Sequence, residues 1–274
     1  MKPTSKFDII ATVVTFNNPI SMLNDVQKTL FETTLRVKLV FIDNSSNAEI
    51  KAFAQDKGID YISGHGNVGF GAGHNIGIRE YVDQSRYFLI LNPDVIIEEG
   101  CLEKLAKFMD EASQVPLCTP LILNPDRSIQ FVNKRLPTVA TLFARRFFKN
   151  YLGKKYEKEL NFFTLQDQFP FKTPLVVPVI TGCFMFFRST ALKKLKGFDE
   201  HFFLYMEEFD LSRRSSKLGP NVLYPEASVI HSWGRGPHKS LKLLWINIQS
   251  IYYYFTKWGF RTDGPDSVVK PFNG

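Results

Sequence analysis

The chain has 274 residues, of which 44% are hydrophobic and 22% are charged, with a formal net charge of +7. This is the composition of a globular protein with a substantial core in one or two domains, not of a disordered chain, and no run of about 20 apolar residues predicts a membrane-spanning helix. The positive charge favours an anionic partner, such as a nucleotide, a lipid headgroup or a nucleic acid. Three dispersed cysteines predict reduced thiols in a cytosolic setting, without a disulfide framework or a zinc site.

Residues 7–123 alternate between strand and helix patterns. The first apolar run is too short for a signal peptide and reads as a strand. Strands are predicted at 7–16, 37–45, 59–64, 86–94 and 116–123, and helices at 19–35, 47–57 and 98–112, with a glycine-rich stretch at 64–82. Strands that alternate with helices of this length predict βαβ units and an α/β fold with a mostly parallel sheet covered by helices on both faces.

The regular alternation stops after residue 124. Residues 134–173 are basic, aromatic and irregular, which we interpret as an insertion. A strand pattern returns at 175–189, followed by a loop and a helix within 197–219, a strand at 221–233 and an amphipathic helix at 240–258. We therefore expect one domain over 1–235 and a C-terminal helix and tail over 236–274.

The stretch "YFLILNPDVII" at 87–97 ends an apolar run with Asn92-Pro93-Asp94. Proline cannot donate to a strand ladder, so pairing should stop there and leave Asp94 at the carboxyl end of a central strand. Ligands of open α/β sheets bind at that end. The alternative is an ordinary turn, because Asn-Pro-Asp is common turn chemistry.

Polar residues also follow the first two predicted strands. The first ends in Thr15-Phe16-Asn17 and the second in Asp43, so these side chains should share one crevice. An acid there could accept hydrogen bonds from a base or a ribose, or it could simply cap a helix, a role that Ser45 could also fill.

The glycine-rich stretch "GNVGFGAGHNIG" does not fit the dinucleotide fingerprint, because Ile76 stands where its third glycine should be. A glycine-rich turn that feeds a helix still presents backbone N–H groups to an anion. Tight packing between strand and helix is the alternative. Both interpretations remain open from the sequence.

Three acids, Glu207, Glu208 and Asp210, open a predicted helix, and a late His231 follows in "VIHSWGRG". Taken alone, the acids could be a solvated helix face and the histidine a structural residue.

In combination, these motifs resemble glycosyltransferase family 2, and most closely its bacterial rhamnosyltransferase-like members. The order is VTFN, IDNSS, N-x-G-F-G-x-G-x-N-x-G, LNPD, TGCFMFFR, GFDE-x-F-F-x-Y-x-E-E-x-D-L and a late histidine, from about residue 8 to 235. The resemblance implies a GT-A fold, in which a Rossmann-like nucleotide half merges with an acceptor half. It also implies an inverting transferase that moves a sugar from a nucleoside diphosphate to a hydroxyl group.

The resemblance assigns roles to residues of this chain. Asp94 matches the last acid of the family's D-x-D metal motif, His231 the histidine that completes the metal shell, and Glu208 the catalytic base. The nucleotide and donor sugar would be held by Thr15, Phe16, Asn17, Asp43, Asn67, Gly69, Phe70, Asn75 and Asn92. The acceptor side would include Gly182, Cys183, Glu207 and Asp210.

Two positions depart from the family pattern. The D-x-D motif is reduced to Asn92-Pro93-Asp94, a variant typical of the rhamnosyltransferase-like branch, and the base is Glu where Asp is usual. We expect Mg²⁺ or Mn²⁺ as cofactor, because a divalent cation neutralises a diphosphate leaving group with few protein ligands. Like charges at 207 and 210 should raise the pKa of the base, offset by Arg213 and Arg214.

The resemblance favours dTDP-L-rhamnose as donor, with UDP-hexoses next, and a cell-surface glycan or lipid-linked glycan as acceptor. Two basic aromatic segments, 141–158 and 240–258, are amphipathic on a helical wheel and could lie on the inner face of the plasma membrane. They could instead pack on the core or on a second copy in a homodimer.

Three rival interpretations are weaker. A sugar-nucleotide pyrophosphorylase would need a basic glycine-rich loop near the N-terminus, and "VVTFNNPIS" has no lysine or arginine. A non-catalytic nucleotide-sugar binder would need no acid at 208. A nucleic-acid-binding protein would interleave its basic residues with a reader motif, which this chain lacks.

Overall fold

The computed structural model describes residues 5–142, 154–232, 241–260, 262 and 264–273. Its strands are β1 (Phe7–Thr15), β2 (Val37–Asp43), β3 (Asp60–Ile62), β4 (Ser85–Leu91), β5 (Val95–Ile97), β6 (Leu117–Leu123), β7 (Leu175–Val176), β8 (Phe184–Arg188), β9 (Asn221–His231) and β10 (Lys270–Pro271). Its helices are α1 (Ile20–Phe31), α2 (Ala48–Asp56), α3 (Phe70–Tyr81), α4 (Cys101–Glu111), α6 (Lys154–Phe163), α7 (Ser189–Leu195), α8 (Glu207–Ser215) and α9 (Leu241–Trp258).

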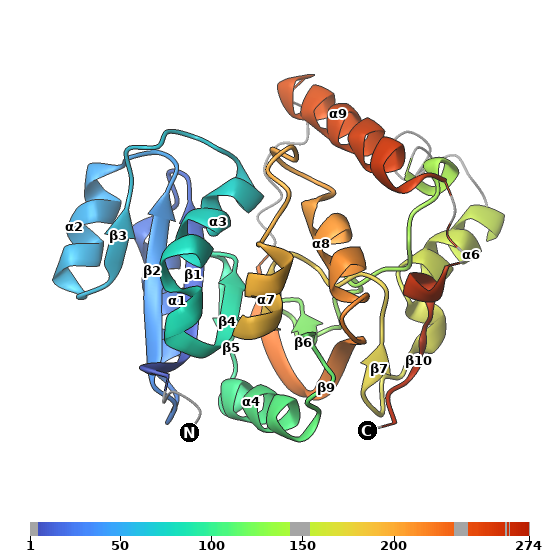
Figure 1. The fold of residues 1–274 in the computed structure, drawn as a ribbon, viewed down its shortest axis with the longest axis horizontal. Coiled ribbons are helices and arrows are strands. Elements are labelled where there is room, and N and C mark those ends of the chain that lie inside the picture. Colours follow the sequence, from blue (N-terminus) through green and yellow to red (C-terminus); the bar gives the residue numbers. More distant parts are fainter. Residues whose placement is uncertain (1–4, 143–153, 233–240, 261, 263, 274) are drawn as a thin grey trace.

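All of these strands join one sheet in the order β10-β7-β9-β6-β8-β4-β1-β2-β3, with β5 paired to β9 beside this path. One direction is shared by β1, β2, β3, β4, β6, β9 and β10, and β5, β7 and β8 run against it. The predicted α/β class, with a mostly parallel central sheet flanked by helices, is confirmed (Figure 1).

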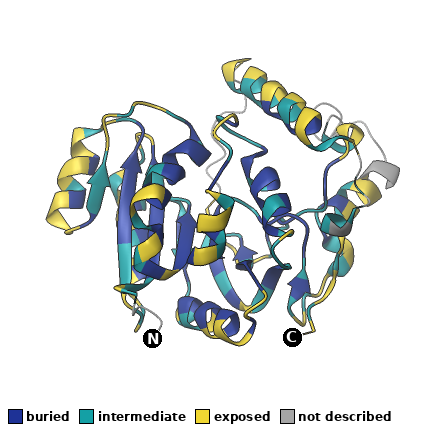
Figure 2. Ribbon diagram, viewed as in Figure 1, coloured by how far each residue is buried: buried dark blue, intermediate teal, exposed yellow. Residues whose placement is uncertain are grey.

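The central strands are apolar on both faces, as β4 illustrates. Tyr87, Leu89 and Leu91 join the core beneath α1, α2 and α4, whereas Phe88 and Ile90 join the core beneath α3, α7 and α8. Side chains alternate along a strand, so a continuous apolar run is needed when helices cover both faces. Figure 2 shows this layer of buried strands between helices whose outer sides are exposed.

Several predicted boundaries move in the structure. The predicted fourth strand ends at Leu91, before Pro93, and β5 begins directly after Asp94. The pattern at 175–189 divides into β7 and β8, and α7 was not predicted. The region interpreted as an irregular insertion contains α6. Of the amphipathic segment predicted at 141–158, residues 143–153 lie outside the described residues, and 154–158 form the start of α6.

The C-terminal segment packs on the same body as the rest of the chain. β10 pairs with β7 at the edge of the sheet, and α9 lies above α8 (Figure 1). Among the described helices, none combines the length and the apolar character needed to cross a bilayer. All three cysteines are buried free thiols, as predicted.

The glycines of α3 allow this helix to lie close to the sheet. A Cβ on Gly73 would lie 2.9 Å from Val14 Cγ2, and one on Gly77 would lie 2.5 Å from Thr12 Cγ2. Thr12 cannot turn away freely, because it is buried and its Oγ1 is hydrogen-bonded to His74 Nδ1 at 2.8 Å. Tight packing, the second interpretation of the glycine-rich stretch, therefore explains these two positions.

Replacing Gly77 by alanine tests this packing. At an unhindered helix position the change would stabilise the protein by about 1 kcal/mol. Here the added methyl group collides with Thr12, so we expect the free energy of unfolding to fall by about 1–3 kcal/mol in urea denaturation. Lys51→Ala, on an exposed position of α2, is the control and should change stability by less than about 0.5 kcal/mol. A Gly77→Ala protein more stable than the wild type would contradict the packing argument.

Candidate active site

The loops after β1 and β2 are fastened together by Asp43. The parallel register pairs Thr15 with Asp43, and the fully buried carboxylate accepts hydrogen bonds from Thr15 Oγ1 at 3.0 Å and Tyr61 OH at 2.7 Å. It also accepts from the backbone N–H groups of Ser45 at 3.0 Å and Asn47 at 2.7 Å. Burial alone would raise the pKa of Asp43, but hydrogen bonds from the Ser45 and Tyr61 hydroxyls and from the Ser45 and Asn47 N–H groups lower it. The carboxylate thus orders its own loop, and its oxygens do not face the crevice.

The alternative in which Asp43 or Ser45 caps the following helix is wrong about the residue. The N-cap of α2 is Asn47, whose Oδ1 accepts from the backbone N–H groups of Glu49 at 2.8 Å and Ile50 at 3.3 Å. Asn47 also donates from Nδ2 to Asn17 Oδ1 at 3.3 Å, which joins this loop to the one after β1. Phe16, in the loop after β1, has 54% of its surface exposed. The structure thus presents an aromatic ring at the carboxyl edge of the sheet.

The turn before α3 carries a glycine that no other residue could replace. Gly69 has a φ of +92°, and a Cβ there would lie 2.1 Å from the carbonyl oxygen of Phe203. That oxygen accepts the backbone N–H of Phe70 at 3.1 Å, so this donor of the first helical turn is not directed at a ligand. Asn67 Oδ1 accepts from the Gly69 N–H at 3.2 Å and orders the turn. The anion-cradle interpretation is therefore weakened by the use of the Phe70 donor.

Asn75 is turned away from the crevice. Its Nδ2 donates to the Phe198 carbonyl and to Glu200 Oε1, both at 2.9 Å, and its Oδ1 accepts the Phe198 N–H at 2.8 Å. The side chain is buried, and these bonds use its whole amide group. Asn75 thus fastens α3 to the loop after α7, and its amide group is already hydrogen-bonded within the protein.

Asp94 and His231 are brought together by the pairing of β5 with β9. Val95 lies opposite His231 in this antiparallel register, and His231 Nε2 is 3.3 Å from Asp94 Oδ1. Both side chains are largely buried, with 13% of Asp94 and 7% of His231 exposed. The turn and the strand-end interpretations of Asn92-Pro93-Asp94 are therefore compatible, because the chain turns here at the end of β4.

A glutamine behind His231 fixes its tautomer. Gln130 Nε2 donates to Asn124 Oδ1 at 2.8 Å and to the His231 carbonyl at 3.2 Å, so Gln130 Oε1 must be the atom 2.7 Å from His231 Nδ1. An amide oxygen only accepts, so Nδ1 carries the proton. In the neutral imidazole, the lone pair of Nε2 therefore faces the Asp94 carboxylate. Two acceptors this close fit a cation bound beside them.

A short segment before β8 connects this pair to Glu208. The carbonyl of Cys183 accepts the Asn92 N–H at 2.9 Å. A Cβ built on Gly182 would lie 3.5 Å from Phe70 Cε1 and 3.7 Å from Glu208 Cβ. The structure therefore brings Gly182, Cys183, Phe70, Asn92 and Glu208 around one place, and Asp94 with His231 beside it.

The acids that open α8 have three different surroundings. Glu207 is buried, with no hydrogen bond to Oε2 from the described residues, and burial followed by the charge of Glu208 raises its pKa well above the usual range. Glu208 is partly exposed and lies 3.9 Å from Lys134 Nζ. Asp210 is fully buried and paired with Lys257 Nζ at 2.7 Å and Arg214 Nε at 2.8 Å. Burial thus separates one accessible acid from two enclosed acids, and Asp210 does not face an acceptor here.

The expected role of the two arginines is wrong. Arg214 pairs with Asp210, and Arg213 Nε donates to Asp266 Oδ2 at 2.5 Å, so neither faces Glu208. The cation paired with Glu208 is Lys134, which belongs to no recognisable motif. Sequence reasoning missed Lys134 and Gln130 because both lie in the irregular chain after β6, where no periodicity marks the inward-facing side chains.

Helix α9 holds the loop that leads into α8. Lys257 Nζ bridges Asp199 Oδ2 at 2.6 Å and Asp210 Oδ1 at 2.7 Å, and Trp258 Nε1 donates to Asp210 Oδ1 at 2.9 Å. Ser250 Oγ donates to the Leu204 carbonyl at 2.9 Å. The C-terminal helix therefore fixes the loop whose Phe203 carbonyl contacts the start of α3.

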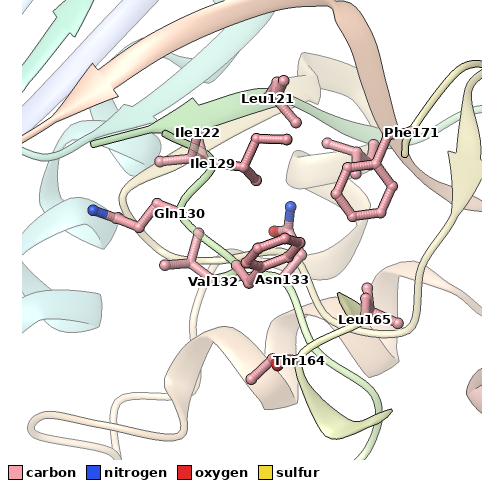
Figure 3. A pocket seen from close by; sticks show the side chains of 11 residues that line it. Leu121, Ile122, Ile129, Gln130, Val132, Asn133, Thr164, Leu165 and Phe171 are labelled. Atoms are coloured by element: carbon pink, nitrogen blue, oxygen red, sulfur yellow. The ribbon is translucent and has the colours of Figure 1, made fainter. Parts of the chain in front are cut away.

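Two hollows of the described surface lie away from this grouping. One, shown in Figure 3, is bounded by the 129–133 segment, Leu165 and Phe171, holds about 10 Å³ and would fit a single water. Gln130 points away from it, consistent with its contacts to His231. Another, of about 290 Å³, lies between β7, Gly219 and Lys270 and contains none of the predicted site residues.

Comparison with known proteins identifies the family of this chain. Residues 11–196, more than half of the chain, match Glycosyl transferase family 2, so the chain belongs to this family and is a glycosyltransferase. It is similar to Rhamnosyltransferase WbbL of Escherichia coli (strain K12), with 28% identity over 201 residues, which covers 71% of this chain and 72% of that protein. It is 30% identical over 196 residues to the N-acetylglucosaminyl-diphospho-decaprenol L-rhamnosyltransferase of Mycobacterium tuberculosis, covering 64% of this chain and 60% of that protein.

Solved structures support the GT-A fold. GalNAc-T7 with UDP, GalNAc and Mn²⁺ aligns with a TM-score of 0.64 at 15% identity, covering 94% of this chain and 49% of that one. The mannosyltransferase PcManGT of Pyrobaculum calidifontis, in complex with GDP-Man and Mn²⁺, aligns with a TM-score of 0.61 at 12% identity, covering 96% and 67%. At these identities the likeness concerns the fold alone. The chain spans about half of the first of these proteins.

Proposed function

We propose that this protein is an inverting glycosyltransferase that moves L-rhamnose from dTDP-L-rhamnose to a hydroxyl of a cell-surface or lipid-linked glycan. The observation that carries the proposal is that the Asp94–His231 pair and Glu208 both lie close to the Gly182–Cys183 segment. A donor diphosphate needs a cationic site, and an acceptor hydroxyl needs a base on the opposite side of the sugar. The grouping supplies candidates for both.

Asp94 and His231 fit a divalent cation, Mg²⁺ or Mn²⁺. A carboxylate oxygen and an imidazole nitrogen are suitable ligands, and Gln130 orients the imidazole from behind. The described residues contain no group of three or more acidic, histidine or cysteine side chains for a metal, so phosphate oxygens and water would complete the shell. When bound, the cation would neutralise charge on the diphosphate leaving group.

Glu208 is the proposed base. It is the accessible acid of α8, and its Cβ lies close to Gly182 at the centre of the grouping. A carboxylate here would accept the proton of the acceptor hydroxyl as the oxygen attacks the anomeric carbon and the nucleoside diphosphate leaves. Attack opposite the leaving group inverts the anomeric centre, and general-base assistance contributes about 10²–10⁴-fold.

The residues proposed for the donor side are of two kinds: those that would contact the donor and those that hold the contacting residues in place. Phe16 is proposed to stack on the base. The other proposed donor-side residues are Thr15, Asn17, Asn67, Gly69, Phe70 and Asn92. Asp43 and Asn75 are proposed as positioning residues, because internal bonds occupy their polar atoms. On the acceptor side, Gly182 and Cys183 remain candidates, with Glu207 and Asp210 as enclosed supports.

The donor assignment draws on the Asn92-Pro93-Asp94 variant and on the two rhamnosyltransferase relatives. A UDP-hexose is the second candidate, favoured by the similarity to the hexosyltransferase Agl10 of Haloferax volcanii, 27% identical over 189 residues. That alignment covers 68% of this chain and 55% of that protein. A pyrophosphorylase or a non-catalytic binder would leave Glu208 without a role.

We propose that residues 1–235 form the catalytic domain and that 236–274 support it.

Helix α9 presents an outer stripe of exposed apolar side chains. They are Leu241, Trp245, Ile248 and Tyr252, with 82%, 61%, 44% and 73% of their surfaces exposed. The helix has no acidic residue, and aromatic and aliphatic side chains of this kind insert into a bilayer interface. We propose that this stripe makes peripheral contact with the inner face of the plasma membrane. A second copy of the chain is the alternative.

The two adjacent acids of α8 should respond differently to the same change. Glu208→Gln removes the proposed base, so kcat should fall by about 10²–10⁴-fold while calorimetry shows retained donor binding. Glu207→Gln replaces a neutral acid with a neutral amide of similar size, so kcat should change much less. Full activity in Glu208→Gln would rule out Glu208 as the base. A large loss of activity in Glu207→Gln alone would identify Glu207 as the base instead.

A donor panel tests the function itself. Purified protein with dTDP-L-rhamnose, UDP-hexoses or GDP-mannose, in Mn²⁺, Mg²⁺ or a chelator, should release nucleoside diphosphate fastest from dTDP-L-rhamnose and only with a divalent metal. Asp94→Ala should lose the metal-stimulated release. Full metal-dependent turnover by Asp94→Ala would contradict the proposed site, and preference for a UDP-hexose would change the donor only.

Flotation with anionic liposomes at low salt tests the membrane contact. The wild type should float, and Trp245→Glu should reduce the bound fraction by about tenfold, because one buried aromatic side chain is worth about 1.5–3 kcal/mol. Gln55→Glu, which adds the same charge to an exposed position of α2, should bind like the wild type. A wild type that stays with the soluble fraction excludes the contact, and dimerisation lost in Trp245→Glu would favour the second copy.

A further inference from the structure

Lys134 lies inside the candidate active site although it belongs to no motif of the chain. Its Nζ is 3.9 Å from Glu208 Oε1, with 12% of its side chain and 18% of that of Glu208 exposed. We propose that Lys134 is a positioning residue that keeps the Glu208 carboxylate ionised and oriented for proton transfer. This inference rests on the proposed role of Glu208 as the base.

The backbone of Lys134 is held rigidly. Its N–H donates to the Val179 carbonyl at 3.0 Å, and the Val179 N–H donates to the Lys134 carbonyl at 3.1 Å, as an isolated antiparallel bridge. The preceding Asn133 accepts the Thr181 N–H at 3.0 Å, which ties the same segment to the chain leading into Gly182. Lys134 is therefore fixed relative to the segment that leads into Gly182.

The side chain of Lys134 is confined as well. Its ammonium group lies 5.0 Å from the ring centroid of Phe209, the residue after Glu208. A cation over an aromatic face is stabilised by the ring, and the largely buried stem has little freedom to swing away. The ammonium group thus stays on the side of α8 that carries Glu208.

The charged and titratable groups around Glu208 include one cation that can pair with its carboxylate. Burial, followed by the charge of Glu208, raises the pKa of Glu207 on the same helix well above the usual range, which disfavours a second carboxylate there. Cys183 beside it is a neutral thiol, because burial raises its pKa to about 12, a value to which the nearby Asp94 also contributes and which Lys134 lowers. Arg213 and Arg214 pair with other acids. Among the described residues, Lys134 is therefore the cation paired with Glu208.

This charge arrangement has a kinetic consequence. A base can accept a proton only while it is ionised, and an opposite charge within about 4–6 Å favours the ionised carboxylate. Loss of the lysine should therefore move the acid limb of the kcat–pH profile upward. Donor binding should change little, because the lysine acts on the acceptor side through Glu208.

The experiment compares kcat–pH profiles between pH 5 and 9 at saturating donor. Lys134→Met should raise the acid midpoint by about 1 unit or more, so that kcat at low pH falls about tenfold and recovers at high pH, with donor KM nearly unchanged. Lys134→Arg should restore the midpoint. Arg135→Met removes the adjacent cation, which pairs with Asp167 at 2.7 Å, and should leave the midpoint in place. If Lys134→Met does not fold, Lys134→Gln carries the same expectation.

Two results would overturn the inference. One is an unchanged midpoint in a folded Lys134→Met or Lys134→Gln protein, whatever its rate. The other is an equal shift in Arg135→Met. The Glu208→Gln variant distinguishes a failure of this inference from a failure of the proposed function. If Glu208→Gln is active, Glu208 is not the base and the proposed function of this residue is rejected. If Glu208→Gln is inactive and the lysine variant has an unchanged midpoint, only the role of Lys134 is rejected.

Discussion

The site depends on the antiparallel register between β5 and β9. The chain leaves β4 at Asn92-Pro93-Asp94, and the short strand β5 that follows pairs with β9 in a register that sets Val95 opposite His231. That register alone brings an acid and a histidine from distant parts of the sequence to 3.3 Å. A slip by one residue would turn the His231 side chain to the other face. The largely buried pair therefore has its geometry set by backbone pairing before any ligand binds.

Burial then assigns different states to acids that the sequence cannot distinguish. Glu207, Glu208 and Asp210 stand within four consecutive positions of one helix. The first is enclosed and neutral, the third is enclosed but matched by Lys257 and Arg214, and only the second reaches the crevice. The Glu208 carboxylate is therefore left beside the Lys134 ammonium group. A helix of three exposed acids would lack this separation of charge states.

The sequence predicted most of what is local. The apolar runs of β1, β2 and β4 predicted a sheet covered on both faces, and the break at Pro93 placed Asp94 at its carboxyl end. Side chains whose partners lie far along the chain were less predictable. Asn75 reads as a ligand-facing amide, yet it bonds to Phe198, and Asp210 reads as an exposed acid, yet α9 covers it. A periodic pattern shows which face of an element is buried, but not which distant element covers it.

The loop before α8 explains why the C-terminal helix belongs to the catalytic arrangement. Tyr205 and Met206 both have positive φ, of 71° and 68°, immediately before Glu207. Such backbone costs about 1–3 kcal/mol per residue unless the surroundings enforce it. Ser250 and Lys257 of α9 hold this loop at Leu204 and Asp199, so their bonds offset that cost. The direction in which α8 starts, and with it the position of Glu208, is thus fixed by residues that follow it in the chain.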